Sequence, residues 1–163
     1  MVATAISREQ ILAWLGEVAD PEIPVLSITD LGIVRDVIVN GNVTVALAPT
    51  YSGCPATEVI EQSVLDALRE HGLDDVAIER VLSPPWTTDW ISDVGREKLR
   101  AYGIAPPAHG ASKRELLRGD QRIACPRCNS QRTELVSEFG STACKASYKC
   151  SDCLEPFEYF KCI

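Results

Sequence analysis

Four cysteines near the C-terminus form two C-x2-C pairs. Cys125 and Cys128 make the first pair and Cys150 and Cys153 the second, with 21 residues between the pairs. Four thiolates in this pattern can close a tetrahedron around one metal ion, as in a zinc ribbon, although the spacing is one residue longer than the usual range. The same sulfurs could hold a single iron ion, and buried thiols without metal are the plainer alternative. We expect structural zinc at these four positions.

Two further cysteines, Cys144 and Cys162, lie in the same segment. Either of them could replace one of the four ligands or assist metal transfer. A free buried cysteine is the simpler interpretation, because cysteine is among the most buried residue types. We therefore regard Cys144 and Cys162 as candidate auxiliary thiols.

Cys54 stands apart from the other cysteines, in the turn Gly53-Cys54-Pro55. A strand is predicted before it and a helix after it, so its thiol would lie at a helix N-terminus. The helix dipole and free amides there favour a thiolate, which could bind a soft metal or attack an electrophile. A small core residue beside a tight turn is the alternative. One cysteine cannot hold an iron–sulfur cluster alone, so further ligands would come from a second subunit, a small thiol or a client protein.

Three acidic residues and a threonine fall in turns that could line the same pocket as Cys54. Carboxylates there could act as hard metal ligands or as hydrogen-bond acceptors. Acids in turns that contain proline or glycine also commonly bond to nearby backbone amides, which is the alternative. The predicted supporting pocket consists of Asp20, Glu22, Asp30 and Thr50.

The elements that must position Cys54 follow from hydrophobic periodicity. A capping box that starts at Ser7 predicts a helix over about 8–19, and Asn40-Gly41-Asn42 joins two strands into a hairpin. Apolar residues at helical spacing after Pro55 predict a second helix, which Gly72 ends. A third strand and another helix complete the order α-β-β-α-β-α, with strands at 33–39, 43–48 and 76–82 and the last helix ending before Gly103.

The segment 106–122 is rich in proline, glycine, alanine and charge and shows little periodicity, which indicates a linker. We therefore predict a first domain over 1–105 and a ribbon over 123–163. So short a ribbon usually needs a metal to fold, because its apolar burial alone does not offset the loss of chain entropy. The predicted fold class is α+β: a small α-β-β-α-β-α domain followed by a C-terminal zinc ribbon.

Composition limits the classes of protein that fit. The 163 residues are 45% hydrophobic and 24% charged, with no apolar run that could span a bilayer, which argues against membrane and disordered proteins. The N-terminus lacks a secretory pattern, so we expect a cytoplasmic protein with reduced thiols. The net charge is −7, and the ribbon has five basic and five acidic residues, so a nucleic-acid-binding ribbon is disfavoured. The sequence also lacks a phosphate-binding loop and a Ser-His-Asp arrangement, so we expect a non-enzyme.

Three motifs carry a resemblance to a known family: Asp20-Pro21-Glu22-Ile23-Pro24, Asp30-Leu31-Gly32-Ile33-Val34 and Thr50-Tyr51-Ser52-Gly53-Cys54-Pro55. Residues 7–104 resemble the metal-sulfur cluster biosynthesis family, whose small α+β domain assists iron–sulfur assembly. The ribbon, from Cys125-Pro126-Arg127-Cys128 to Phe157-Glu158-Tyr159-Phe160-Lys161-Cys162, resembles the D subunits of bacterial phenylacetyl-CoA epoxidase systems.

The resemblance implies a maturation factor for phenylacetate degradation. Such a factor would assist assembly or transfer of an iron–sulfur cluster, or of iron, into the oxygenase or reductase component, with Cys54 as a transient ligand. The alternative is an integral oxygenase or electron-transfer subunit with iron in the four-cysteine ribbon. Because each chain carries one Cys54, pairing across a two-fold axis predicts a homodimer.

Overall fold

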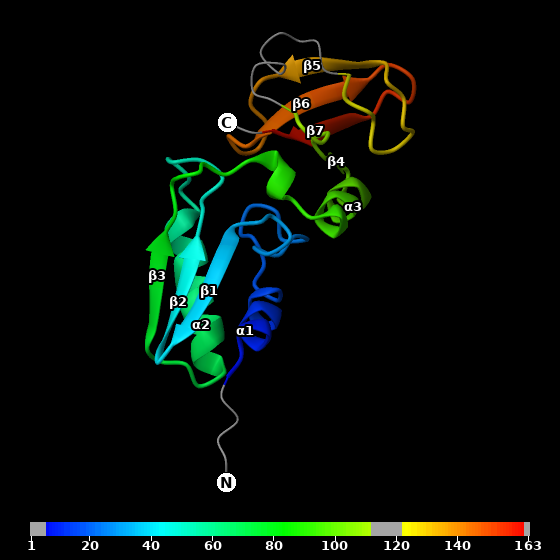
Figure 1. Cartoon of the computed structure of the whole chain (residues 1–163). Coiled ribbons are helices and arrows are strands. Elements are labelled where there is room, and N and C mark those ends of the chain that lie inside the picture. The colour runs from blue at the N-terminus through cyan, green and yellow to red at the C-terminus, as the bar shows by residue number, and fades with distance from the viewer. Residues whose placement is uncertain (1–5, 112–121, 162–163) are drawn as a thin grey trace. The chain divides into compact units, whose positions relative to one another are not determined.

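A computed structural model of the chain describes residues 6–111 and 122–161 (Figure 1). The chain divides into two compact units between Trp86 and Thr87. In the described part, none of the helices combines the length and apolarity that a membrane span requires. The architecture is α+β, as predicted, and each unit is described by itself below.

The first unit pairs a layer of two helices with a three-stranded sheet. The sheet order is β1-β2-β3, with β1 antiparallel and β3 parallel to β2. α1 packs on α2 and β1, and α2 also packs on β3. The elements are α1 (Arg8–Leu15), β1 (Val34–Asn40), β2 (Asn42–Leu47), α2 (Thr57–Glu70) and β3 (Val76–Arg80).

The core of this unit follows from the two periodicities of its sequence. Every second residue of β2, from Val43 to Leu47, is buried, while α2 buries three residues at four-residue spacing. α1 adds Ile11 and Leu15, and each such fully buried aliphatic side chain contributes about 1.5–3 kcal/mol. The α2 set is Ile60, Val64 and Leu68.

The first helix is shorter than predicted. It ends at Leu15, because the Gly16 amide closes the last turn on the carbonyl oxygens of Leu12 and Ala13. The chain then forms turns up to β1, held by the isolated bridge between Ala19 and Ser27. Val18 is buried in this turn region, so its apolar side chain extended the helical pattern beyond the helix.

The second unit is built on a four-stranded sheet of order β4-β7-β6-β5. β4 is parallel to β7, and the other neighbours are antiparallel. A 3₁₀ turn and one helix precede the sheet in the chain. The elements are η1 (Thr88–Trp90), α3 (Asp93–Tyr102), β4 (Ile104–Ala105), β5 (Thr133–Ser137), β6 (Lys145–Cys150) and β7 (Pro156–Phe160).

The compact units divide the chain before the predicted limit of the first domain. α3 and β4 belong to the second unit, because β4 pairs with β7 and Ala105 shares a buried cluster with Cys150 and Tyr159. Local periodicity cannot reveal such a long-range pairing. The limits 1–105, 106–122 and 123–163 stay predictions, and positions 112–121 of the linker lie outside the described residues.

Candidate metal centre and thiol site

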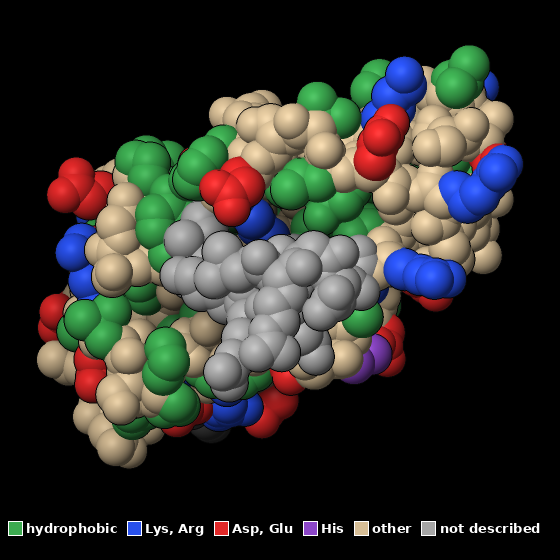
Figure 2. All heavy atoms as spheres, turned by 90° about the horizontal axis from the view of Figure 1, so that it is seen from above, with side chains coloured by type: hydrophobic (Ala, Val, Ile, Leu, Met, Phe, Trp, Pro, Cys, Tyr) green, Lys and Arg blue, Asp and Glu red, His purple; other side chains and the backbone are tan. Residues whose placement is uncertain are grey.

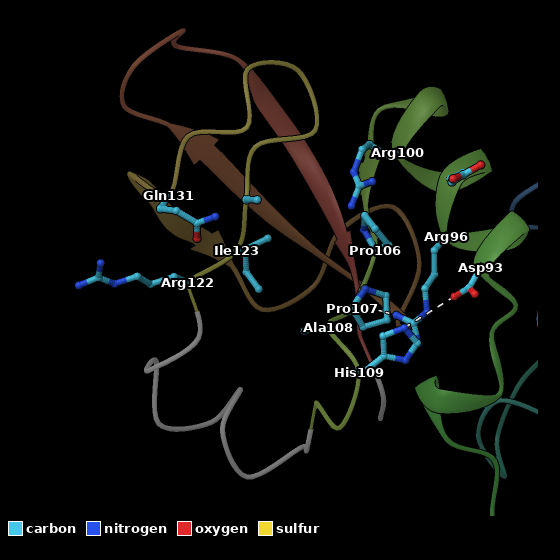
Figure 3. A pocket seen from close by; sticks show the side chains of 12 residues that line it. Asp93, Arg96, Arg100, Pro106, Pro107, Ala108, His109, Arg122, Ile123 and Gln131 are labelled. Atoms are coloured by element: carbon cyan, nitrogen blue, oxygen red, sulfur yellow. Dashed lines mark hydrogen bonds and ion pairs between the residues drawn. The ribbon is translucent and has the colours of Figure 1, made fainter.

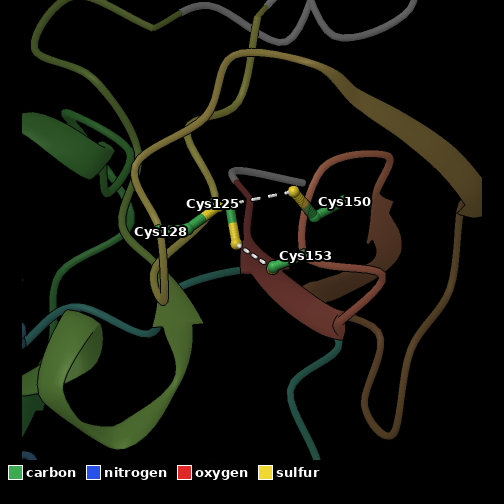
Figure 4. A group of neighbouring side chains, drawn as sticks. All are labelled: Cys125, Cys128, Cys150 and Cys153. Carbon is green, nitrogen blue, oxygen red and sulfur yellow. Dashed lines mark hydrogen bonds between the residues drawn. The ribbon is translucent and has the colours of Figure 1, made fainter.

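The four predicted ligands come together in the second unit (Figure 4). The sulfurs of Cys125, Cys128, Cys150 and Cys153 all lie within 4.8 Å of one another. Two of the distances are shorter: 3.7 Å between Cys125 and Cys153 and 3.6 Å between Cys128 and Cys150. A tetrahedron with metal–sulfur bonds of about 2.3 Å has edges of about 3.8 Å, so this group fits one four-coordinate ion.

The thiols of this group influence one another's ionisation. At Cys128 the Ser130 amide favours the thiolate, but desolvation and the three other cysteines outweigh it and raise the Cys128 pKa to about 11. At Cys150 the Cys153 amide and the neighbouring thiols lower the pKa. Since like charges at this separation oppose each other, four thiolates need a cation between them.

Each C-x2-C pair forms a turn of the same construction, which we call a knuckle: residues 125–130 and 150–155. In each knuckle the amide of the first cysteine donates to the carbonyl oxygen five residues later, at 2.9 Å. The residue after the second cysteine has a left-handed backbone, with φ of 60° at Asn129 and 63° at Leu154. The asparagine gave a signal for this conformation, but the leucine gave none.

Polar contacts tie the two knuckles together. Arg127 of the first knuckle pairs with Glu155 of the second, and Ser130 donates to Asp152. Arg132, just after the first knuckle, also pairs with Asp152, and its carbonyl oxygen accepts from the Ser151 amide at 2.8 Å. The sequence analysis did not identify these residues, because their partners are separated by more than 20 positions.

The candidate auxiliary thiols are not among the four clustered sulfurs. Cys144 is buried just before β6, with the Thr142 hydroxyl 3.1 Å from its sulfur, and its carbonyl oxygen accepts from the Lys161 amide. Cys162 lies outside the described residues. An auxiliary role for either thiol stays a prediction.

Cys54 lies in the first unit, in the turn that leads into α2. Its amide donates to the carbonyl oxygen of Tyr51, and its own carbonyl oxygen accepts from the amide of Thr57, both at 3.2 Å. The helix begins at Thr57 with Ala56 as its N-cap, so Cys54 precedes the helix instead of belonging to its first turn. The side chain is half-buried, which leaves the thiol partly accessible.

Cys54 lines a cavity of about 450 Å³ in the first unit. The cavity wall combines hydroxyl, charged and apolar side chains. Its charged members are Glu58 and Arg80, and Arg80 also donates two hydrogen bonds to Glu61. These bonds lower the pKa of Glu61. The other lining residues are Pro49, Ser52, Pro55, Thr57 and Leu82.

The predicted supporting residues do not line this cavity: Asp20, Glu22, Asp30 and Thr50. Asp20 is buried and accepts from the amides of Glu22 and Ile23 at 2.9 and 2.8 Å. Asp30 accepts from the Ser27 amide at 3.1 Å and donates its own amide to the Ser27 hydroxyl. Asp20 and Asp30 thus hold turns, as the alternative interpretation had it, and support for Cys54 stays a prediction.

Comparison with known proteins identifies both parts of the chain. Residues 8–80 match the family described as "Iron-sulfur cluster assembly protein", and residues 109–161 match the "PaaD zinc beta ribbon domain". Over 94% of its length the chain is 50% identical to a protein of Escherichia coli (strain K12) named as the D subunit of 1,2-phenylacetyl-CoA epoxidase, of which it covers 92%. The chain belongs to the family of phenylacetyl-CoA epoxidase D subunits. The resemblance stated from the sequence is therefore confirmed.

Relatives of the first unit are found without the ribbon. A protein of Porphyromonas gingivalis (strain ATCC BAA-308 / W83) named Fe-S protein maturation auxiliary factor is 36% identical over 53% of this chain and 85% of its own length. The crystal structure of a domain of unknown function (DUF59) from Bacillus anthracis is 27% identical and superposes with a TM-score of 0.53, covering 56% of this chain and 90% of that one. Of the two parts of the D-subunit family, the first thus occurs as a protein of its own.

Proposed function

We propose that this chain is a non-catalytic accessory factor of a phenylacetyl-CoA epoxidase system. It assists assembly or transfer of an iron–sulfur cluster, or of iron, into the oxygenase or reductase component. The proposal rests on one combination: an iron–sulfur assembly domain joined to the zinc ribbon of the D-subunit family in a single chain. The name of the Porphyromonas gingivalis relative, a maturation auxiliary factor, supports the same role.

Cys54 is the thiol that we assign to transfer. It is half-buried in a turn and lines a cavity, so an incoming metal can reach its sulfur while the wall restricts access. A thiolate binds iron, but one thiolate cannot hold a cluster. The remaining ligands then come from the client, from a small thiol, or from Cys54 of a second copy in a homodimer. Light scattering tests the last possibility, because a strict monomer with bound cluster would contradict it.

The ribbon is assigned to structural zinc. All four ligands are cysteines, two of them are fully buried, and the set leaves no open coordination position. Zinc would supply the positive charge that four thiolates require. Iron in the same place would instead favour an electron-transfer subunit, and it is distinguished by colour, since thiolate-bound ferric iron absorbs visible light and zinc does not.

The proposed transfer role is tested with Cys54→Ala beside Ser52→Ala, a control in the same turn and cavity wall. Each variant is purified anaerobically, reconstituted with iron and sulfide, and assayed for loading of the purified oxygenase and reductase. We expect both variants to keep one zinc per chain and the wild-type fold. Only Cys54→Ala should lose labile iron and sulfide and client loading.

Full client loading by Cys54→Ala would overturn the assignment of Cys54. Iron that stays in the protein after Cys54→Ala, with a visible spectrum and no zinc, would place the redox chemistry at the ribbon. That second result would favour the electron-transfer alternative over the accessory role.

A further inference from the structure

A second cavity, of about 620 Å³, lies within the second unit, between α3 and the segment that leads to Cys125 (Figure 3). Its volume falls in the range of about 300–1,000 Å³ that is typical of small-molecule sites. None of the clustered cysteines lines it, so it is distinct from the metal centre. One part of its wall carries arginines and another is apolar: Arg96, Arg100 and Arg122, and Pro106, Pro107 and Ile123.

The positive charge of this wall is only partly balanced. Arg100 and Arg122 are exposed, and neither side chain forms an ion pair within residues 6–111 and 122–161. Two carboxylates also line the cavity, Asp93 and Glu97, but an Asp93 oxygen already lies 3.7 Å from Nε2 of His109. Three guanidinium groups therefore gather around one cavity in a chain whose net charge is −7.

Arg96 provides an independent observation at the same cavity. Its residue is only 8% exposed, and its two terminal nitrogens donate to the carbonyl oxygens of Pro107 and Thr88. Its Nε is the one buried side-chain nitrogen or oxygen without a hydrogen-bond partner in the described part of the chain. An unsatisfied buried donor costs about 1–3 kcal/mol, which an acceptor bound at this wall would recover.

The side chains are arranged so that a ligand would meet both kinds of wall. Arg96 and His109 lie beside Pro107 on the side of α3, whereas Arg122 and Gln131 lie across from them, with Ile123 between (Figure 3). Arginine presents a planar fork of donors that matches the oxygens of a phosphate group. The two prolines and the isoleucine offer a dry surface for the organic part of such a ligand.

We propose that this cavity binds the phosphate group of a small molecule. The group could belong to an organic phosphate, such as a nucleotide, or to inorganic phosphate, because the guanidinium forks recognise the same oxygens in both. The proposal does not depend on Cys54 or on transfer of a cluster.

The test is a titration of the full-length, zinc-loaded protein by calorimetry and by backbone amide NMR. The probes are ADP, inorganic pyrophosphate and adenosine, at 50 and 500 mM NaCl. We expect ADP to shift amides near Ala108 and Ile123 and to bind at least tenfold more weakly at the higher salt. The double variant Arg100→Gln/Arg122→Gln should bind ADP at least tenfold more weakly, whereas Arg69→Gln, on α2, should bind like the wild type.

The probes distinguish the two sources of phosphate. ADP binding at least tenfold more tightly than pyrophosphate would identify an organic phosphate as the ligand class, and equal binding would identify inorganic phosphate. The proposal is overturned if neither phosphate binds at millimolar concentration, if adenosine binds as well as ADP, or if the double variant binds like the wild type.

Discussion

The first unit folds around aliphatic side chains of two helices and a sheet, whereas two cysteines lie inside the core of the second unit. Cys54, the sole cysteine of residues 1–86, is half-buried in a turn. Cys125 and Cys150 are 1% and 0% exposed and belong to the buried cluster around Tyr159. The difference teaches that burial separates the two uses of cysteine here. A thiol outside the core can serve chemistry, and a thiol inside it serves the fold.

Removal of a ribbon ligand should have the largest effect on stability. Structural zinc contributes about 10–16 kcal/mol to the folding of small zinc-binding peptides, which exceeds what so small a core supplies. We expect Cys150→Ser, or chelation of the wild-type metal, to abolish amide protection in β6 and β7 while protection in β2 persists. Hydrogen exchange measured region by region checks this.

The control for that experiment is Cys144→Ser, a buried cysteine of the same unit that is not among the clustered sulfurs. It should keep one zinc per chain and the protection of β6. If Cys150→Ser kept the wild-type exchange pattern, the contrast between the two kinds of cysteine would fail.

A smaller effect is expected at the left-handed residues of the knuckles. Leu154 is 66% exposed and has a φ of 63°, so Leu154→Gly relieves backbone strain and sacrifices little burial. We expect it to stabilise the ribbon by about 1 kcal/mol, because a leucine in this conformation costs about 1–2 kcal/mol. Asn129→Gly should gain only a few tenths, since asparagine adopts this conformation more readily. Denaturation midpoints of the zinc-loaded proteins compare the two, and an equal gain would contradict the strain argument.

In the first unit the pair of Arg80 and Glu61 offers a test that involves no metal. The Glu61 side chain is 18% exposed and that of Arg80 is 51% exposed, so Glu61→Gln should destabilise this unit by about 0.5–1 kcal/mol at pH 7. The hydrogen bonds from Arg80 lower the Glu61 pKa in the folded state. The stabilisation is therefore present above the unfolded pKa of about 4.3 and is lost as the pH falls through the folded value.

Urea denaturation of the wild type and of Glu61→Gln at several pH values measures this difference. Glu70→Gln, on the same helix and exposed, is the matched control and should show no such dependence. A wild-type advantage that stayed constant from pH 7 to pH 3 would show that ionisation of Glu61 is not its source.

The smallest effect on stability is expected at Cys54. Because its side chain is half-buried in a turn, Cys54→Ser should change the free energy of unfolding by no more than about 0.5 kcal/mol. Cys125→Ser measured beside it should abolish folding of the ribbon. A large loss of stability with Cys54→Ser would mean that this thiol serves the fold after all.

Sequence patterns anticipated the features that depend on neighbouring residues. The two knuckle motifs, the hairpin at Gly41 and the order of the elements are local, so spacing and turn residues were sufficient to predict them. The lining of the Cys54 cavity was not predicted, because Arg80 and Leu82 reach it from the end of β3. The pairing of β4 with β7 and the gathering of Arg100 and Arg122 also depend on chain segments that are distant in sequence.

The position of β4 determines where the chain can be cut. Ile104 and Ala105 cover one edge of β7, opposite Glu158 and Tyr159. A fragment that starts at 106 would leave this edge open, and unpaired strand edges promote self-association. A fragment that starts at Thr87 would retain the covering strand together with α3. The shortest piece that can be produced in isolation as a well-behaved ribbon is therefore expected to begin well upstream of its first cysteine.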